Sequence, residues 1–183
     1  MRVTLEPHPD SFAPGLRIEA EAQRAAPARL VLRYVVTGEI GTLLLPPPAP
    51  PGRADGLWRH TCFEAFVRAP AEAGYVELNF APSGQWAAYG FSGYRTGMAP
   101  LDALPPPEIE AQQDGGRYVL AASLDLAPVL GRLADLPWQL GLSAVIETQD
   151  GGMSWWAAAH PPGDPDFHHR DCFALELPAA KHA

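Results

Sequence analysis

Prolines and glycines interrupt this chain so often that no long helix is expected. Together they occupy 38 of its 183 positions, as 21 prolines and 17 glycines. An interior proline costs a helix about 3 kcal/mol, because it removes a backbone hydrogen bond and clashes with the preceding turn. The hydrophobic fraction of 47% still supplies a core, which excludes general disorder. The chain is therefore expected to consist of short extended segments joined by proline-rich turns.

Apolar and polar residues alternate along several segments, as is typical of strands with one buried face. The clearest is LRIEAEA, at 16–22, and the proline-rich segment 46–56 is expected to be a loop that is neither strand nor helix. The other expected strands are 30–37, 61–68, 75–81, 85–91, 109–113, 117–124, 138–148, 153–159 and 172–177.

These patterns predict an all-β fold. We expect residues 1–183 to form a single domain, an antiparallel β-sandwich of about ten strands that is jelly-roll-like. At most one short helix is expected, within 125–136, where Asp125 is a candidate N-cap and Pro128 falls in the first turn. An irregular crossover is the alternative for that segment.

The net charge of the chain limits the classes of partner that it is expected to bind. Lys and Arg number 13 against 21 Asp and Glu, which gives a formal net charge of −8, and no basic stripe is present, so nucleic acid is not an expected partner. No apolar run is long enough for a membrane span, and the N-terminal residues lack the apolar stretch of a signal peptide. A cytoplasmic location is expected, with Cys62 and Cys172 as buried free thiols.

The first region with candidate site residues is LWRHTCFEAF. Trp58, Arg59 and His60 lie there at the end of a loop, where binding residues gather on rigid scaffolds. Glu64 follows among apolar neighbours, and its burial is costly unless it is paired. A structural ion pair with Arg59 or Arg95 is therefore as good an interpretation of Glu64 as a binding role.

The second region is a predicted hairpin followed by a loop. Glu77 and Asn79 share one face of its first strand, and the aromatic residues Trp86, Tyr89 and Tyr94 come after the turn. Polar groups beside aromatic rings suit a sugar, because a ring face stacks on the apolar face of a pyranose. The alternative for each aromatic residue is a place in the core.

The third region contains adjacent tryptophans and a polar loop. Trp155 and Trp156 must point to opposite faces of a strand. The following loop, 160–171, holds three histidines and three aspartates, and turn-forming solvated residues are the preferred interpretation of it. The alternative is a metal site for Zn²⁺ or Ca²⁺, although the spacing matches no zinc motif. Its candidate ligands are Asp164, Asp166, His168 and Asp171.

Catalytic motifs are missing from the sequence. No GxSxG elbow, GxGxxG after a strand, P-loop or HExxH is present. Cys62 and His60 share a strand face but lie about 7 Å apart along it, which is too far for a nucleophile and its base. We therefore do not expect an enzyme.

Three runs, LWRHTCFEAFV, YVELNFAPSGQWAAYGFSGYRTGM and SWWAAAHPPGDPDFHHRDCF, resemble bacterial DOMON-like proteins, a group related to the family-9 carbohydrate-binding modules. The resemblance extends over 56–173. It implies a β-sandwich that binds a ligand, a sugar or haem, and does no chemistry. Sugar-binding relatives clamp a saccharide between aromatic side chains and contain structural calcium, which implies Trp58, Trp86 and Trp156 as clamp candidates.

The haem-binding relatives imply a methionine and a histidine as axial ligands. The residues available for that role are Met98, Met153, His60 and His160.

Taken together, the sequence predicts a non-catalytic module that binds a small molecule or glycan, with a carbohydrate as the leading ligand. Haem or another cofactor held in the sandwich is one alternative, and a structural domain whose acidic surface docks a protein partner is another. The predicted ligand-binding residues are Trp58, Arg59, His60, Glu64, Asn79, Trp86, Tyr94, Arg95 and Trp156.

Overall fold

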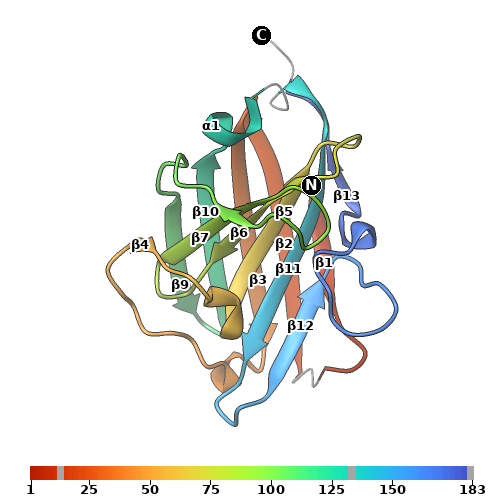
Figure 1. The fold of residues 1–183 in the computed structure, drawn as a ribbon. Helices are drawn as coiled ribbons and strands as arrows, with labels where there is room; N and C mark the ends of the chain where they lie inside the picture. The colour runs from red at the N-terminus through yellow and green to blue at the C-terminus, as the bar shows by residue number, and fades with distance from the viewer. Residues whose placement is uncertain (12–14, 132–134, 181–183) are drawn as a thin grey trace.

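One connected path of hydrogen-bonded strands forms the fold in the computed structural model, which describes residues 1–11, 15–131 and 135–180 (Figure 1). Among these residues only β4 and β7 pair in parallel, and every other strand pairing is antiparallel. The path runs, in spatial order, through β4 (Gly52–Arg53), β7 (Gln85–Phe91), β6 (Tyr75–Phe80), β5 (Cys62–Arg68), β11 (Trp138–Glu147), β12 (Met153–Ala157), β1 (Arg2–Pro7), β2 (Leu16–Ala26), β3 (Arg29–Gly38), β10 (Arg117–Asp125) and β9 (Glu108–Asp114). Two short strands lie beside it, β8 (Ala99–Pro100) next to β7 and β13 (Leu175–Leu177) next to β11.

Strand β1 joins two halves of this curled sheet. Its residues 2–5 pair with β2, and Glu6 and Pro7 pair with β12. Residues from both halves share the main hydrophobic core, and the hydroxyl of Tyr34 on β3 donates a hydrogen bond of 2.6 Å to the carbonyl of Glu64 on β5. The two halves therefore face each other across one core.

Alternation along each strand decides which side chains enter that core. On β5, Phe63, Ala65 and Val67 belong to the main core, whereas Phe66 belongs to a second apolar cluster. Successive side chains of a strand point to opposite faces, so β5 to β7, β11 and β12 bury both of theirs. Their second face is covered by the loops 92–98 and 160–173, and the candidate site lies there.

The prediction of a mostly β chain with at most one short helix is confirmed. An entirely antiparallel arrangement is wrong, because β4 runs parallel to β7 inside the segment expected to be a loop. A sandwich of two separate sheets is not what the pairing shows, because β1 makes the path continuous. Thirteen strands are present among the described residues, and β1, β4 and β8 were not expected from the sequence.

The helix is shorter than the segment predicted for it. α1 covers Ala127–Leu130, with proline in its first turn as expected. The N-cap is Leu126 and not the predicted Asp125, whose side chain nevertheless accepts a hydrogen bond of 2.9 Å from the backbone N–H of Ala127. Residues 132–134 of the predicted helix lie outside the described residues.

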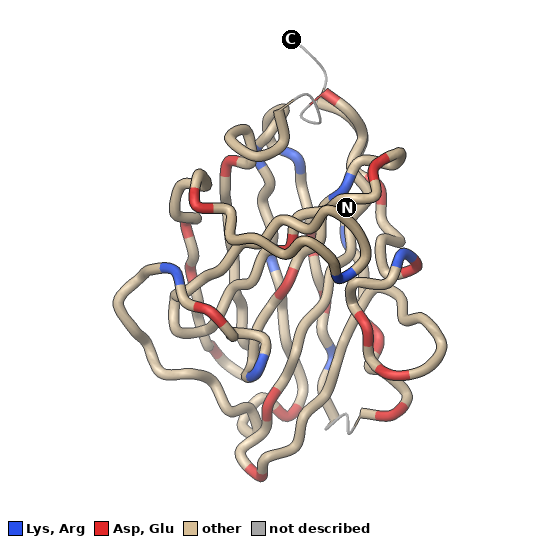
Figure 2. The backbone as a smooth tube through the Cα atoms, viewed as in Figure 1, with Lys and Arg blue, Asp and Glu red and all other residues tan. Residues whose placement is uncertain are grey.

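Other sequence-based expectations concern charge, thiols and helix length. Among the described residues, the Arg positions are scattered along the backbone among the Asp and Glu positions and form no continuous stripe (Figure 2). Cys62 and Cys172 are both free and buried, as predicted. In the part of the chain that the structure describes, none of the helices combines the length and the apolar character needed to cross a membrane.

Candidate ligand-binding pocket

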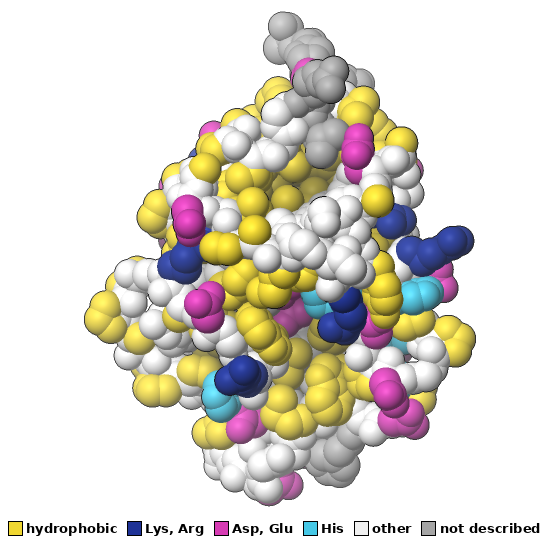
Figure 3. Space-filling model, in the orientation of Figure 1, with side chains coloured by type: hydrophobic (Ala, Val, Ile, Leu, Met, Phe, Trp, Pro, Cys, Tyr) yellow, Lys and Arg dark blue, Asp and Glu magenta, His cyan; other side chains and the backbone are white. Residues whose placement is uncertain are grey.

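A pocket of about 330 Å³ opens on the face of β5, β6, β7, β11 and β12 that points away from the main core. This volume lies at the lower end of the range of about 300–1,000 Å³ for small-molecule sites. The space-filling view shows a hollow with acidic atoms at its base, framed by apolar, Arg and His side chains (Figure 3). The lining residues are Trp58, Glu64, Glu77, Phe91, Arg95, Met98, Val145, Trp155, Pro165, Phe167 and His168.

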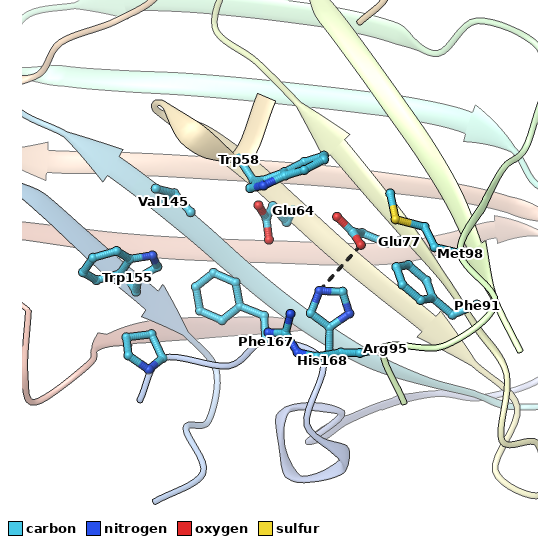
Figure 4. Close-up of a pocket in the computed structure, with 11 residues that line it drawn as sticks. Trp58, Glu64, Glu77, Phe91, Arg95, Met98, Val145, Trp155, Phe167 and His168 are labelled. Atoms are coloured by element: carbon cyan, nitrogen blue, oxygen red, sulfur yellow. Dashed lines mark ion pairs between the residues drawn. The ribbon is translucent and has the colours of Figure 1, made fainter. Parts of the chain in front are cut away.

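Two glutamates from neighbouring strands form the floor of the pocket, and we call them the carboxyl pair. Glu64 on β5 pairs in register with Asn79, and Glu77 on β6 pairs with Phe66. The two carboxyl groups therefore stand on one sheet face as diagonal neighbours and lie side by side (Figure 4).

Glu64 is almost completely buried, with 2% of its surface exposed. Its Oε2 accepts a long hydrogen bond of 3.4 Å from the Ser143 hydroxyl, and its Oε1 has no hydrogen-bond partner within the described structure. Burial, followed by the negative charge of Glu77, raises the pKa of the Glu64 carboxyl well above its usual value. The predicted ion pair of Glu64 with Arg59 or Arg95 does not form among the described residues.

Glu77 has better partners than Glu64. Its Oε1 accepts a hydrogen bond of 2.7 Å from the side-chain amide of Asn79, and its Oε2 lies 3.8 Å from Nε2 of His168. Burial raises the pKa of Glu77, although the hydrogen bond from Asn79 and the charge of Arg95 act in the opposite direction. In the carboxyl pair, Glu77 is therefore held by hydrogen bonding, whereas Glu64 has one oxygen without a partner within the described structure.

His168 separates the pocket from a neighbouring hollow. Its Nδ1 lies 2.8 Å from the hydroxyl of Tyr75, and its ring packs edge-on against Phe66 and Phe91. Burial, together with the positive charge of Arg95, lowers the pKa of His168 to about 4. The imidazole is therefore neutral near pH 7 and adds no positive charge beside the carboxyl pair.

Arg95 reaches the pocket from a strained turn. Its φ of 51° is left-handed, a conformation that few residues other than glycine adopt. The guanidinium Nη2 donates to Oδ1 of Asp166 over 2.7 Å, and the hydroxyl of Tyr94 donates to Oδ2 of the same carboxylate over 2.5 Å. These contacts fix the loop 92–98 to the loop 160–173. They also place Arg95 in an ion pair with Asp166.

Aromatic side chains form the walls. Trp58 stands on a 3₁₀ turn, Leu57–Arg59, that begins after Gly56 in a left-handed conformation with φ of 75°. Its ring packs edge-on against Tyr89 at a centroid distance of 5.8 Å, and 36% of the residue remains exposed. Trp155 and Phe167 line the pocket from β12 and from the loop that follows it (Figure 4).

The structure brings some of the sequence-predicted site residues together. Trp58, Glu64 and Arg95 line the pocket. Asn79 lies beneath it, where its amide holds Glu77, and Tyr94 lies beside it, bound to Asp166.

The remaining predicted residues lie elsewhere. Trp86 and Trp156 belong to the main core, because their positions on β7 and β12 point to the opposite face of the sheet. Arg59 and His60 line a separate hollow, where Nδ1 of His60 is 2.8 Å from Glu147. The three clamp candidates Trp58, Trp86 and Trp156 therefore do not line one concavity, and Trp155 takes the place of Trp156.

Some pocket residues were missing from the predicted ligand-binding site, and the sequence indicated their position to different degrees. Glu77 shares a strand face with Asn79, two residues away, so alternation could have added it. The position of His168 had no such signal, because it depends on how a long loop docks on the sheet. The same holds for Phe167 and Met98.

The predicted metal ligands do not assemble into a metal site. In residues 1–11, 15–131 and 135–180, no group of three or more His, Cys, Asp or Glu side chains is arranged to hold a metal ion. Asp166 is bound by Arg95 and Tyr94, His168 faces Tyr75 and Glu77, and Asp171 lies 3.6 Å from His169. The four predicted ligands therefore do not gather around one point in the described structure.

Axial haem ligation finds no support in this geometry either. Met98 lines the pocket, whereas His60 lines the separate hollow near Glu147. Met153 packs against the second apolar cluster, and Nε2 of His160 lies 2.9 Å from the carbonyl of Glu6. These residues do not present a methionine and a histidine to one shared cavity.

The chain matches no protein-family model, and no curated protein matches its sequence. Several solved structures resemble the fold, including the following two. A proposed carbohydrate-binding protein from Bacteroides uniformis has a TM-score of 0.60 at 11% identity, covering 92% of this chain and 83% of that chain. A family-9 carbohydrate-binding module from Caldicellulosiruptor kristjanssonii, in complex with glucose, has a TM-score of 0.50 at 10% identity, covering 84% and 72%. These likenesses show a shared fold.

Proposed function

We propose that this protein is a non-catalytic carbohydrate-binding module whose pocket holds one sugar unit. The observation that carries the proposal is the unpaired, buried Oε1 of Glu64 on the floor of a pocket with tryptophan walls. An unpaired buried oxygen is destabilising, and a ligand hydroxyl that donates to it removes that penalty.

The pocket offers both kinds of contact that a sugar requires. The rings of Trp58 and Trp155 are suited to the apolar face of a pyranose. The carboxyl pair, Arg95 and His168 supply acceptors and donors for its hydroxyl groups. Support also comes from the shared fold, because one of the similar structures is a family-9 module in complex with glucose. The DOMON-like resemblance remains a prediction.

The arrangement of the carboxyl pair favours binding over hydrolysis. Glycoside hydrolases place two carboxyl groups on either side of the scissile bond. Here Glu64 and Glu77 stand side by side on one sheet face, so that both meet the same side of a ligand (Figure 4). We propose that the protein does not turn over aryl glycosides, and release of nitrophenol from a panel of nitrophenyl glycosides would contradict this.

Calorimetric titration with monosaccharides and disaccharides tests the binding proposal. We expect Kd values in the range of about 10 µM to 1 mM for at least one sugar, as is ordinary for a small pocket with few polar contacts. Trp155→Ala should weaken that binding about tenfold or more, because it removes a wall of the pocket.

Leu136→Ala is the control, because it truncates a hydrophobic side chain that does not line the pocket. It should bind sugar as the wild type does. Failure of every sugar to bind at millimolar concentration would overturn the proposed function, as would undiminished binding by a folded Trp155→Ala variant.

A further inference from the structure

The carboxyl pair gives the pocket an excess of acidic groups over cations. Among the described lining residues, Arg95 is the one permanent cation. Its charge is already neutralised by Asp166, whose Oδ1 lies 2.7 Å from Nη2 of Arg95. His168 is neutral near pH 7, because its pKa is about 4. Glu64 and Glu77 therefore face the pocket without a full positive charge to balance them.

Two further observations indicate which kind of ligand group would pair with these carboxyl groups. Glu64, a residue 98% buried, lines the pocket, and its Oε1 has no hydrogen-bond partner within the described structure. The walls around it are the aromatic residues Trp58, Phe91, Trp155 and Phe167. Aromatic faces attract cations as well as sugar rings, and a desolvated site strengthens this attraction. An open acidic acceptor within aromatic walls suits an ammonium group.

We infer that the preferred ligand is an amino sugar, whose protonated amine lies against Glu64 and Glu77 while its ring lies between the aromatic walls. This inference rests on the proposed function and names the class of sugar. Neutral sugars fit the same walls but form no ion pair with either carboxyl group.

Binding of an ammonium group should release a proton. In the free protein, burial and the charge of Glu77 raise the pKa of Glu64, so this carboxyl holds its proton above the usual range. A cation beside it favours the ionised form. The protonated carboxyl and the ammonium ion therefore become a carboxylate–ammonium pair, and one proton goes to the solvent.

Other groups around the carboxyl pair do not supply this proton near neutral pH. Cys62 on β5 and Tyr34 on β3 both have a pKa raised by burial, so both stay protonated. Tyr75 on β6 and Tyr89 on β7 also have raised pKa values. On the covering loops, Arg95 stays charged and paired with Asp166, and His168 stays neutral. On β11, the group that faces Glu64 is the hydroxyl of Ser143, which does not titrate in this range.

Calorimetry at pH 6 with glucosamine, glucose and N-acetylglucosamine tests the inference. An amine of this kind titrates at about pH 7.7–8.0 and is therefore protonated at pH 6. We expect glucosamine to bind about tenfold more tightly than glucose or N-acetylglucosamine, the gain of a charge-assisted hydrogen bond. Two buffers of different ionisation enthalpy should reveal proton release for glucosamine alone.

Glu64→Gln keeps the shape and an acceptor but removes the acid. It should abolish the preference, so that glucosamine and glucose bind to the variant with equal affinity. The matched control is Glu72→Gln, which makes the same change at an exposed position outside the pocket and should keep the preference.

The outcomes separate this inference from the proposed function. Equal affinity for glucosamine and glucose would overturn the inference and leave the proposed function standing, and so would a preference that persists in Glu64→Gln. Binding of cyclohexylamine without binding of any sugar would support the ammonium site and overturn the sugar assignment. Failure of all these probes to bind would overturn both.

Discussion

At the scale of single residues, Glu64 is buried on the floor of the pocket with one oxygen unpaired. Because burial and Glu77 raise its pKa, the folded protein binds this proton more tightly than the unfolded chain does. The contribution of Glu64 to the free energy of unfolding therefore decreases as the pH rises above about 4.5, the ordinary pKa of a glutamate.

Glu64→Gln removes this dependence, and we expect the variant to be more stable than the wild type at pH 8, by about 1–3 kcal/mol. The difference should shrink as the pH falls toward 4.5 and vanish below it, where the wild-type carboxyl is protonated in both states. Urea denaturation at several pH values measures it. Glu72→Gln, at an exposed position, should show no such trend, and a Glu64→Gln variant less stable than the wild type at pH 8 would contradict the argument.

At the scale of elements, two loops cover the pocket and are tied to each other through Asp166. Although burial acts to raise it, hydrogen bonds from Tyr94 and Arg95 hold the pKa of Asp166 below its usual value. The backbone N–H of His168 also donates to this carboxylate over 3.0 Å. Asp166 therefore positions Arg95 and His168 together.

Asp166→Ala should loosen this loop pair without unfolding the sheet. We expect amide hydrogen exchange in 92–98 and 166–170 to accelerate about tenfold, while global stability decreases by roughly 1 kcal/mol or less, because the ion pair is partly exposed. Hydrogen exchange followed by mass spectrometry measures both. Asp164→Ala, in the same loop at an exposed position, is the control, and equal acceleration there would show that Asp166 has no special role.

At the scale of the whole molecule, β1 connects the two halves of the curled sheet. Leu5, 1% exposed, anchors this strand in the main core. We propose that the chain is a single folding unit, because residues from both halves pack into that core.

Leu5→Ala should therefore destabilise both halves together, by about 2–5 kcal/mol, as expected for truncation of a fully buried leucine. Unfolding should remain one transition, with tryptophan fluorescence and far-ultraviolet circular dichroism coinciding. Glu6→Ala, at an exposed position on the same strand, should leave the midpoint unchanged. Two separate transitions in the variant or in the wild type would show that the halves fold independently.

The strands with regular alternation could be predicted from the sequence, and the others could not. LRIEAEA alternates over its whole length and the segment around Glu77 alternates over 76–80, so these strands and their two faces were readable. The segment around Glu64 is an apolar run without alternation, so its strand was readable but the face of Glu64 was not. β4 and β8 contain two residues each, and they are strands only because they pair with β7. Such pairing depends on distant contacts that leave no local pattern.

The candidate site was partly predictable for the same reason. Glu64 and Asn79 lie within regular strands, and Trp58 adjoins one, so their neighbourhood followed from the chain pattern. Trp155 and Trp156 were known to point apart, but nothing local showed which one enters the core. Because β12 buries both of its faces, only packing against the other half of the sheet decides this.

The sequence by itself determined that the chain is β-rich, that its helix is short, and which side chains share a strand face. Proline placement and alternation act within a few residues, so these properties are local. The tertiary structure decided which face carries the pocket and which residues close it. His168 and Arg95 meet the carboxyl pair because Arg95 binds Asp166, 71 residues later in the chain, and contacts over such separations depend on the folded sheet that holds both loops.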